Sequence, residues 1–157
     1  MTNLIGEFEC RLDPKGRIML PASLKKQIPS EAKDRFVINR GIEKCLVIYP
    51  KHDWDATSSE INALNMYVKK NRDFARYFYR GATELGLDST NRLLFPKQLL
   101  EYAGIEKDLV LFAYSNKIEV WAKETYDKLL GDEPEDFSTL AEEVMGRKSN
   151  ISSTDVS

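Results

Sequence analysis

The chain is poor in the residues that carry most metal and redox chemistry, with two cysteines and one histidine among 157 residues. Cys10 and Cys45 lie in stretches typical of strands, which favours reduced thiols in a cytoplasmic protein over a disulfide framework. No stretch approaches the roughly 18 to 20 consecutive apolar residues that a membrane span needs. The first seven residues have neither a basic start nor an apolar run, so the sequence predicts no secretory signal. We therefore expect a cytoplasmic protein without a membrane partner.

A large net charge of one sign is also absent, since the formal net charge is −2, and this total alone argues against a nucleic-acid binder. The charge is unevenly distributed, however. Residues 1–54 carry ten Lys and Arg against seven Asp and Glu, whereas residues 127–157 carry three against eight. A basic front half is thus joined to an acidic tail, and a charged partner responds to the local field rather than to the total.

One ten-residue pattern occurs twice, 75 positions apart: LDPKGRIMLP at 12–21 and LDSTNRLLFP at 87–96. Asp, Arg and Pro coincide in the two copies, and each copy is typical of a tight turn between strands, the second of which stops at proline. Gly16 is replaced by Asn91 in the second copy. After glycine, asparagine is among the residues that best tolerate a left-handed backbone, so both copies can form the same turn. The pattern indicates a true structural repeat.

Alternation and helical periodicity predict a mainly β chain with short helices, an α+β class. Strands are expected at 7–12, 17–20, 35–40, 46–49, 83–87, 92–95, 108–114 and 117–121, with a hairpin at Ser115 and Asn116. Helices are expected at 21–28, from residue 50 onward, at 71–80, 97–103 and 123–130, and at 137–144. The chain is accordingly divided into a first repeat (5–54), a helical connector (55–80), a second repeat (81–126) and an acidic helix with a disordered tail (127–157).

The helical connector carries two apolar patterns and a basic stripe. The first helix is predicted to bury a stripe of Trp54, Ile61, Leu64 and Val68, and the second to turn Phe74, Tyr77 and Phe78 inward. Three arginines, Arg72, Arg76 and Arg80, are spaced four apart and so share one helix face. This face is either simply solvated or a basic ridge for phosphates or for an acidic neighbouring subunit.

The two turns allow a structural and a functional interpretation. In the first, the carboxylates of Asp13 and Asp88 organise their turns, and Arg17 and Arg92 only pair with them at the surface, which contributes little to stability. In the second, each aspartate orients a guanidinium that reaches outward, where its fork of donors fits phosphate oxygens or a guanine edge.

The two D-x-x-x-R turns, each leading to proline, resemble the tandem repeat of the MraZ family of bacterial regulators. Further resemblance lies in Arg40-Gly41, in CLVIYP at 45–50 with Trp54, and in EVW at 119–121. It covers about residues 4–130, in register and in order, whereas the tail past 131 carries little of it. One D-x-x-x-R turn is a weak signal, but two on this frame are specific.

The resemblance implies the swapped-hairpin β-barrel of the AbrB class (SpoVT-AbrB), with two copies per chain forming a pseudo-dimer. It also implies ring-shaped homo-oligomers in the nucleoid that bind double-stranded DNA at short repeats. The expected role is a transcriptional regulator, specifically a repressor, at the promoter of the cell-division and cell-wall gene cluster. Asp13, Arg17, Asp88 and Arg92 correspond to the family's motif residues. No cofactor, metal or small-molecule substrate is implied.

The residues add an asymmetry between the two loops. The first loop carries Lys15 beside Arg17 in a segment of net charge +3, whereas the second has no lysine and lies in a segment of net charge −2. We expect the first loop to be the main DNA contact, with Gly16 and Asn91 shaping the turns. Further phosphate contacts are expected from Arg11, Lys25 and Lys26.

An enzyme is poorly supported by the sequence. The single histidine, His52, has Asp53 and Asp55 nearby, but these two would point apart on a helix, so helix capping is favoured over metal binding. There is no phosphate-binding glycine loop and no G-x-S-x-G nucleophile motif.

The other alternative is a protein-binding module like the antitoxins of the AbrB class, with residues 137–144 as the partner-binding segment. The same segment could instead pack on its own domain. The two complete repeats favour the regulator.

Overall fold

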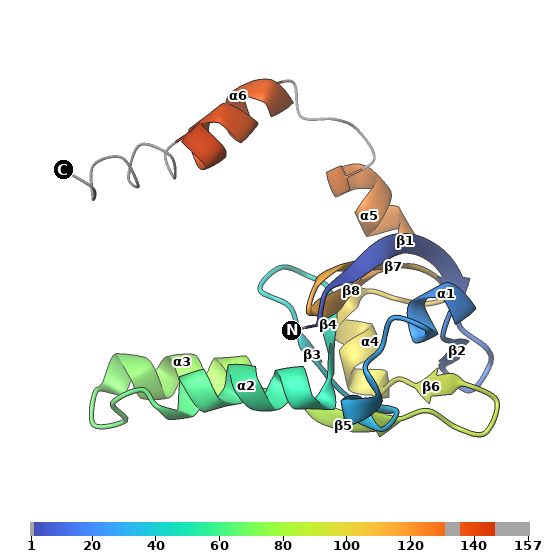
Figure 1. The fold of residues 1–157 in the computed structure, drawn as a ribbon, viewed down its shortest axis with the longest axis horizontal. Coiled ribbons are helices and arrows are strands. Elements are labelled where there is room, and N and C mark those ends of the chain that lie inside the picture. Colours follow the sequence, from blue (N-terminus) through green and yellow to red (C-terminus); the bar gives the residue numbers. More distant parts are fainter. Residues whose placement is uncertain (1, 131–135, 147–157) are drawn as a thin grey trace. The chain divides into compact units, whose positions relative to one another are not determined.

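The computed structural model describes residues 2–130 and 136–146 and is mainly β with short helices, as predicted (Figure 1). Along the chain the elements are β1 (Leu4–Arg11), β2 (Arg17–Met19), α1 (Ala22–Lys25), η1 (Ser30–Ala32), β3 (Arg35–Arg40), β4 (Leu46–Pro50), α2 (Lys51–Asn62), α3 (Lys69–Tyr79), β5 (Thr83–Gly86), β6 (Arg92–Leu94), α4 (Lys97–Ala103), β7 (Asp108–Ser115), β8 (Lys117–Ala122), α5 (Lys123–Leu130), α6 (Phe137–Ala141) and η2 (Glu142–Gly146). Of the described residues, those up to Tyr126 form one compact unit and those from Asp127 onward belong to a second.

The two repeats are interlaced rather than side by side. One antiparallel sheet has the strand order β1-β7-β8-β4-β3-β5, so β1 of the first repeat pairs with β7 of the second, and β5 of the second pairs with β3 of the first. In the two repeats β1 is equivalent to β5, β3 to β7 and β4 to β8. Exchanging equivalent strands gives the same order read from the other edge of the sheet, so the sheet has pseudo-twofold symmetry. The axis passes between β4 and β8 near the pair of Val47 and Glu119. This exchange of hairpins confirms the swapped-hairpin class.

The predicted barrel is open. Within the described residues, β1 and β5 end the six-stranded sheet, and β2 and β6 pair only with each other as a separate two-stranded ribbon. One continuous core joins both repeats and is shared by the sheet, the ribbon, α1 and α4. Its most deeply buried side chains include Ile18, Leu24, Phe36, Ile38, Leu46, Ile48, Leu93, Leu109, Leu111 and Ile118. Because the inner face of the ribbon is buried in this core, its outer face is held rigidly.

The helical hairpin between the repeats differs from the prediction. Helix α2 ends at Asn62, so Leu64 and Val68 are not part of its buried stripe and are exposed. The side-chain oxygen of Asn65 accepts a hydrogen bond from the N–H of Tyr67 at 3.0 Å, and this Asx turn competes with continuation of the helix.

The predicted inward face of α3 is right for Phe78 and wrong for Phe74 and Tyr77. Phe74 and Tyr77 are 51% and 71% exposed, and the buried residue is Ala75. Phe78 stacks on Trp54 with ring centroids 5.7 Å apart, and its carbonyl accepts a 2.6 Å hydrogen bond from the buried Asn39 amide. These contacts tie the end of α3 to the sheet.

Of the arginine stripe on α3, Arg72 donates to the carbonyls of Met66 and Tyr67 at the tip of the hairpin. Arg76 lies 3.7 Å from Asp73, and Arg80 is exposed. Arg72 therefore has a structural role in closing the loop. Arg76 is exposed on α3, and Arg80 follows the end of the helix at Tyr79 with an extended backbone, so the three do not share one helix face.

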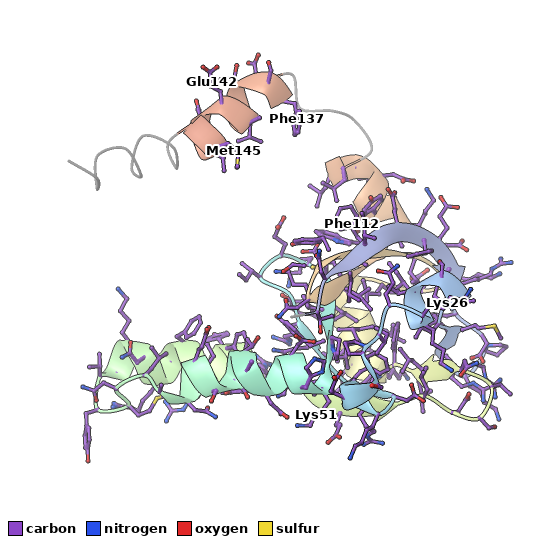
Figure 2. All side chains as sticks on the ribbon, viewed as in Figure 1. Lys26, Lys51, Phe112, Phe137, Glu142 and Met145 are labelled. Atoms are coloured by element: carbon purple, nitrogen blue, oxygen red, sulfur yellow. The ribbon has the colours of Figure 1, made fainter. Side chains whose placement is uncertain are left out.

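The second unit contains the predicted amphipathic segment. Helix α6 continues into the π-helix η2. Phe137 and Leu140 of α6 and Val144 of η2 are exposed, and Phe137 is labelled in Figure 2. The expectation of a disordered tail falls largely on residues 147–157, which lie outside the described residues.

Candidate nucleic-acid interface

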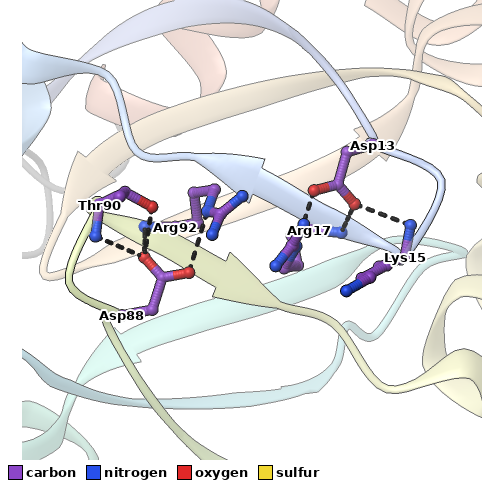
Figure 3. A network of polar contacts seen from close by, with 6 residues as sticks. All are labelled: Asp13, Lys15, Arg17, Asp88, Thr90 and Arg92. Carbon is purple, nitrogen blue, oxygen red and sulfur yellow. Dashed lines mark hydrogen bonds and ion pairs between the residues drawn. The ribbon is translucent and has the colours of Figure 1, made fainter.

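The two D-x-x-x-R turns meet in the ribbon formed by β2 and β6 (Figure 3). Ile18 is paired with Leu93, its own repeat equivalent, so the pseudo-twofold axis also passes through the centre of the ribbon. Each strand is extended by a hydrogen bond to the turn of the other repeat: Leu20 N–H to the Asn91 carbonyl at 2.9 Å, and Phe95 N–H to the Gly16 carbonyl at 3.0 Å. The two loops are therefore joined directly through the backbone of the ribbon.

Asp13 holds the first turn with both carboxylate oxygens. Its Oδ1 accepts hydrogen bonds from the backbone N–H groups of Lys15 and Arg17, each at 2.9 Å, and its Oδ2 accepts one from Arg17 Nε at 2.7 Å. Gly16 closes the turn with φ +84° and donates to the Asp13 carbonyl. A single carboxylate thus fixes both the bend and the arginine.

The second turn repeats this arrangement around Asp88. Its Oδ1 accepts hydrogen bonds from the N–H and hydroxyl of Thr90 and from the N–H of Arg92, and Oδ2 accepts one from Arg92 Nε at 2.9 Å. Asn91 occupies the glycine position with φ +63°, which confirms the left-handed conformation expected from the exchange with Gly16. Two different sequences therefore build one loop geometry.

Both carboxylates are held in their charged form. Hydrogen bonds from the backbone of Arg17 lower the pKa of Asp13 below its usual 3.8, and those from Arg92 lower the pKa of Asp88 to about 2. In each case donors around the carboxylate outweigh its partial burial. The aspartates are consequently ionised, and orient their arginines, at any physiological pH.

The arginines keep donors available on the outer face of the ribbon. The Arg17 and Arg92 side chains are 23% and 32% exposed. Each uses Nε for its aspartate, while no hydrogen bond of either pair of Nη groups occurs within residues 2–130 and 136–146. The free ends form two forks of N–H donors on one surface, which is the arrangement that a phosphate or a guanine edge requires.

Met19 and Leu94 share this outer face and were not singled out from the sequence. Met19 lies opposite Arg92, and Leu94 lies opposite Arg17. They are 63% and 55% exposed and place two apolar side chains between the arginines on one face of the ribbon. Alternation with the buried Ile18 and Leu93 could have located them, because neighbouring strand residues face opposite sides.

The remaining basic candidates are distributed differently from the prediction. Lys15 is exposed at the tip of the first loop. Lys25, an expected phosphate contact, donates from Nζ to the Asn91 side-chain oxygen in the second loop at 2.9 Å. Lys26 is exposed on the same side, and Arg11 lies 3.6 Å from Asp108 across the edge pair β1–β7. The structure therefore brings positive charge to the second loop, which the local sequence charge did not reveal.

Comparison with known proteins agrees with this architecture. A family model described as “MraZ protein, putative antitoxin-like” matches the chain twice, over residues 4–77 and 78–148. The chain belongs to the MraZ family.

Proteins named “Transcriptional regulator MraZ” are similar to this chain over nearly its whole length. The one from Christiangramia forsetii is 46% identical over 93% of this chain and 95% of its own. That from Flavobacterium psychrophilum is 45% identical over 93% and 94%, and that from Cytophaga hutchinsonii 37% identical over 89% and 93%. The MraZ family assignment therefore extends well beyond the two loop motifs.

Outside the ribbon, the MraZ-family chain offers little for metal chemistry. His52 Nε2 lies 3.1 Å from the Thr2 hydroxyl and 3.3 Å from Asp53 Oδ2, at the start of α2. Among the residues that the structure describes, no group of three or more His, Cys, Asp and Glu is arranged to hold a metal ion. Cys45 is buried and Cys10 half-buried, and both are free thiols. In the same part of the chain, no helix has the length and apolar character needed to cross a membrane.

Proposed function

We propose that this protein is a DNA-binding transcriptional regulator that contacts the duplex with the outer face of the β2–β6 ribbon. The observation that carries the proposal is the pair of aspartate-held guanidinium groups on one exposed, pseudo-symmetric surface. The names of its relatives support the same role, since the similar proteins are called transcriptional regulators.

The dimensions of the ribbon suit the major groove. That groove is about 12 Å wide and admits a two-stranded β-ribbon, and strands in a ribbon lie about 4.8 Å apart. Arg17 and Arg92 present their Nη groups as forks for guanine O6 and N7 or for phosphate oxygens. Because Asp13 and Asp88 already fix the Nε atoms, less side-chain entropy is lost when DNA binds.

The apolar residues between the arginines add a second kind of contact. Met19 and Leu94 lie directly across the ribbon from Arg92 and Arg17 and are the exposed apolar side chains of its two strands. A thymine methyl group is the apolar feature of the major groove that such side chains contact. The ribbon therefore combines polar and apolar readout of the base edges.

A single ribbon makes few phosphate contacts, so one chain alone should bind DNA weakly. We propose, from the family resemblance, that chains assemble into rings that place several ribbons on one surface. Once one ribbon has bound a DNA repeat, the other ribbons are at a high effective concentration near the neighbouring repeats, so the ring binds more tightly than one chain. The exposed Phe74 and Tyr77 on α3 are candidate contacts between subunits. Repression of the promoter of the cell-division and cell-wall cluster, and association with the nucleoid, form part of the same proposal and rest on the resemblance.

The test is binding to DNA from upstream of the protein's own gene, measured by fluorescence anisotropy at fixed salt. Arg17→Ala and Arg92→Ala should each weaken binding roughly 5- to 150-fold, because one bidentate contact contributes about 1–3 kcal/mol. Since the structure places Lys25 at the second loop, local charge no longer favours Arg17 over Arg92, and we expect comparable losses.

Two further variants separate the roles. Arg17→Lys keeps the positive charge but loses the fork of N–H donors. Its DNA affinity should be as low as that of Arg17→Ala if Arg17 binds a base edge, and close to that of wild type if Arg17 contacts only a phosphate. Arg76→Ala removes an exposed arginine of α3, which is not part of the ribbon, and should bind as wild type does. If Arg76→Ala weakens binding as much as Arg17→Ala, the ribbon has no special role.

The alternative function is a protein-binding module. It is favoured by the family description as antitoxin-like and by the exposed apolar residues of α6 and η2. Recovery of one stoichiometric protein partner, together with no retention on the upstream DNA, would make this alternative the better account.

A further inference from the structure

An aromatic groove of about 460 Å³ lies on the outer face of the six-stranded sheet. Val47 and Tyr49 of β4 line it and alternate along the strand with Leu46 and Ile48, which are buried in the core on the other face. The β2–β6 ribbon packs on that core, so the groove is separate from the proposed DNA-binding surface. Its aromatic lining residues are Tyr49, Phe74, Tyr77, Phe78, Tyr102 and Tyr114.

Two of these rings present apolar surface to the outside of the chain. Phe74 stacks on Phe78 with ring centroids 6.0 Å apart and is still 51% exposed, and Tyr77 is 71% exposed. Contiguous exposed apolar surface beside a groove marks an interaction site. The groove therefore offers aromatic rings that a further apolar group can cover.

Positive charge borders the groove. Lys44 Nζ lies 4.2 Å from the ring centroid of Tyr102, and Lys117 Nζ lies 5.1 Å from that of Tyr114. The guanidinium of Arg40 lies over the Tyr102 ring as well, at 4.3 Å. Among the residues that the structure describes, none of these three cations has an ion-pair partner. Their charge is consequently available to an acidic ligand.

The negative charge of the groove is smaller and partly engaged. Its acidic lining residues are Glu43 and Glu119. Glu119 accepts hydrogen bonds from the Tyr114 hydroxyl at 3.0 Å and from Trp121 Nε1 at 3.1 Å. Three bordering cations against two carboxylates give a net charge of +1. The groove therefore suits an apolar ligand that carries carboxylates at its margin.

The segment formed by α6 and η2 has this character. Phe137, Leu140 and Val144 are spaced three and four residues apart, and together with Met145 they are 47% to 62% exposed. Phe137, Met145 and the acidic Glu142 are labelled in Figure 2. The charged residues from 136 to 146 are all acidic: Asp136, Glu142 and Glu143. Apolar anchors at this spacing are what a helix inserts into a groove, and methionine packs well against aromatic rings.

We propose that the groove binds the α6–η2 segment of a second copy of this chain. The apolar anchors of the segment cover Phe74 and Tyr77, and its carboxylates lie beside Lys44 and Lys117. The inference rests on the proposed ring and names the two surfaces that meet in it. Because the groove and the segment are different surfaces, the contact between copies is head to tail, and contacts of this type close into rings.

The experiment measures the mass of the full chain by light scattering at one fixed protein and salt concentration. Lys44→Glu with Lys117→Glu reverses the charge at the groove, and Glu142→Lys with Glu143→Lys reverses that of the segment. Each double variant alone brings like charges together, so its mass should fall to that of a single chain. An equimolar mixture of the two pairs opposite charges at every contact and should regain a mass several times that of one chain. Rescue by mixing requires a contact between different chains.

The matched control is Lys97→Glu with Lys107→Glu, which makes the same change in net charge at two exposed lysines that do not line the groove. It should keep the wild-type mass, and circular dichroism establishes that all variants fold.

An unchanged mass for both reversed variants would overturn the proposal and leave the groove to an acidic helix of a different protein, with the ring itself intact. A mixture that keeps the mass of its separate components would also overturn it. A wild type with the mass of a single chain would overturn the ring and this contact together, whereas DNA binding is decided separately by the ribbon variants.

Discussion

The geometry of the first turn gives a prediction about Gly16 whose size can be worked out from the structure. Gly16 has φ +84°, and a Cβ added there would lie 3.7 Å from Leu100 Cδ1 and 3.8 Å from the Phe95 carbonyl oxygen. These are ordinary contacts, so the cost of a side chain comes from the backbone and not from a clash. A left-handed conformation costs an L-residue about 1–2 kcal/mol, which is partly offset by about 0.4–1 kcal/mol because alanine restricts the unfolded chain.

Gly16→Ala should therefore destabilise the protein by roughly 1 kcal/mol, which corresponds to a fall in Tm of roughly 4 °C. Gly16→Asn should cost less, because asparagine adopts this conformation in the second copy, where Asn91 has φ +63°. The assay is urea unfolding followed by tryptophan fluorescence at one fixed protein concentration, since assembly would make stability concentration-dependent.

A matched control exists at the end of α4. Gly104 has φ +67° with open space around its missing Cβ, so Gly104→Ala should cost about as much stability as Gly16→Ala. Gly104 is far along the chain from both turns and does not shape either arginine fork. Gly16→Ala should lower both stability and DNA affinity, and Gly104→Ala stability alone. Finding that Gly16→Ala is as stable as Gly16→Asn, or that it binds DNA like Gly104→Ala, would refute the reasoning.

Two further predictions concern the second turn and assembly. Because the pKa of Asp88 is lowered from 3.8 to about 2, its carboxylate stabilises the fold fully above about pH 4 and loses this contribution as the pH falls through about 2. Asp88→Asn should therefore be less stable than wild type at pH 6, with a difference that becomes smaller as the pH is lowered from 4 to 2; a constant difference in unfolding free energy across that range would contradict this. Replacing the exposed Phe74 and Tyr77 by serine should shift light scattering towards smaller species without loss of helix signal, and an unchanged mass would remove α3 from the subunit contacts.

The features predicted correctly from the sequence are those set by interactions between residues close together in the chain. Helix α4 ends at Gly104 as predicted, the hairpin at Ser115 forms with φ +55°, and both D-x-x-x-R turns have the expected shape. In each case the deciding interaction lies within a few residues, such as a carboxylate bonded to the next turn of backbone or a residue that tolerates positive φ. Such turns and helix ends can be predicted without knowing the tertiary packing.

The errors concern features that depend on distant partners. Phe74 and Tyr77 form an apolar pattern on α3, but the small Ala75 faces inward, and which helix face is buried depends on where Trp54 and Asn39 lie. The contact of Lys25 with Asn91 of the second loop could not be predicted, because the strand exchange that creates it joins residues 66 positions apart. Net charge counted along the sequence misses this contact for the same reason, since the fold brings a cation of one repeat to the loop of the other.

The central claim is that the outer face of the ribbon makes the DNA contact, and the double variant Arg17→Ala with Arg92→Ala tests it most directly. Its affinity for the upstream DNA should be compared with wild type at the same salt concentration, after light scattering has established the same assembly. We expect a loss of at least about 30-fold, since two bidentate contacts of about 1–3 kcal/mol each are removed. Binding within twofold of wild type would contradict the account.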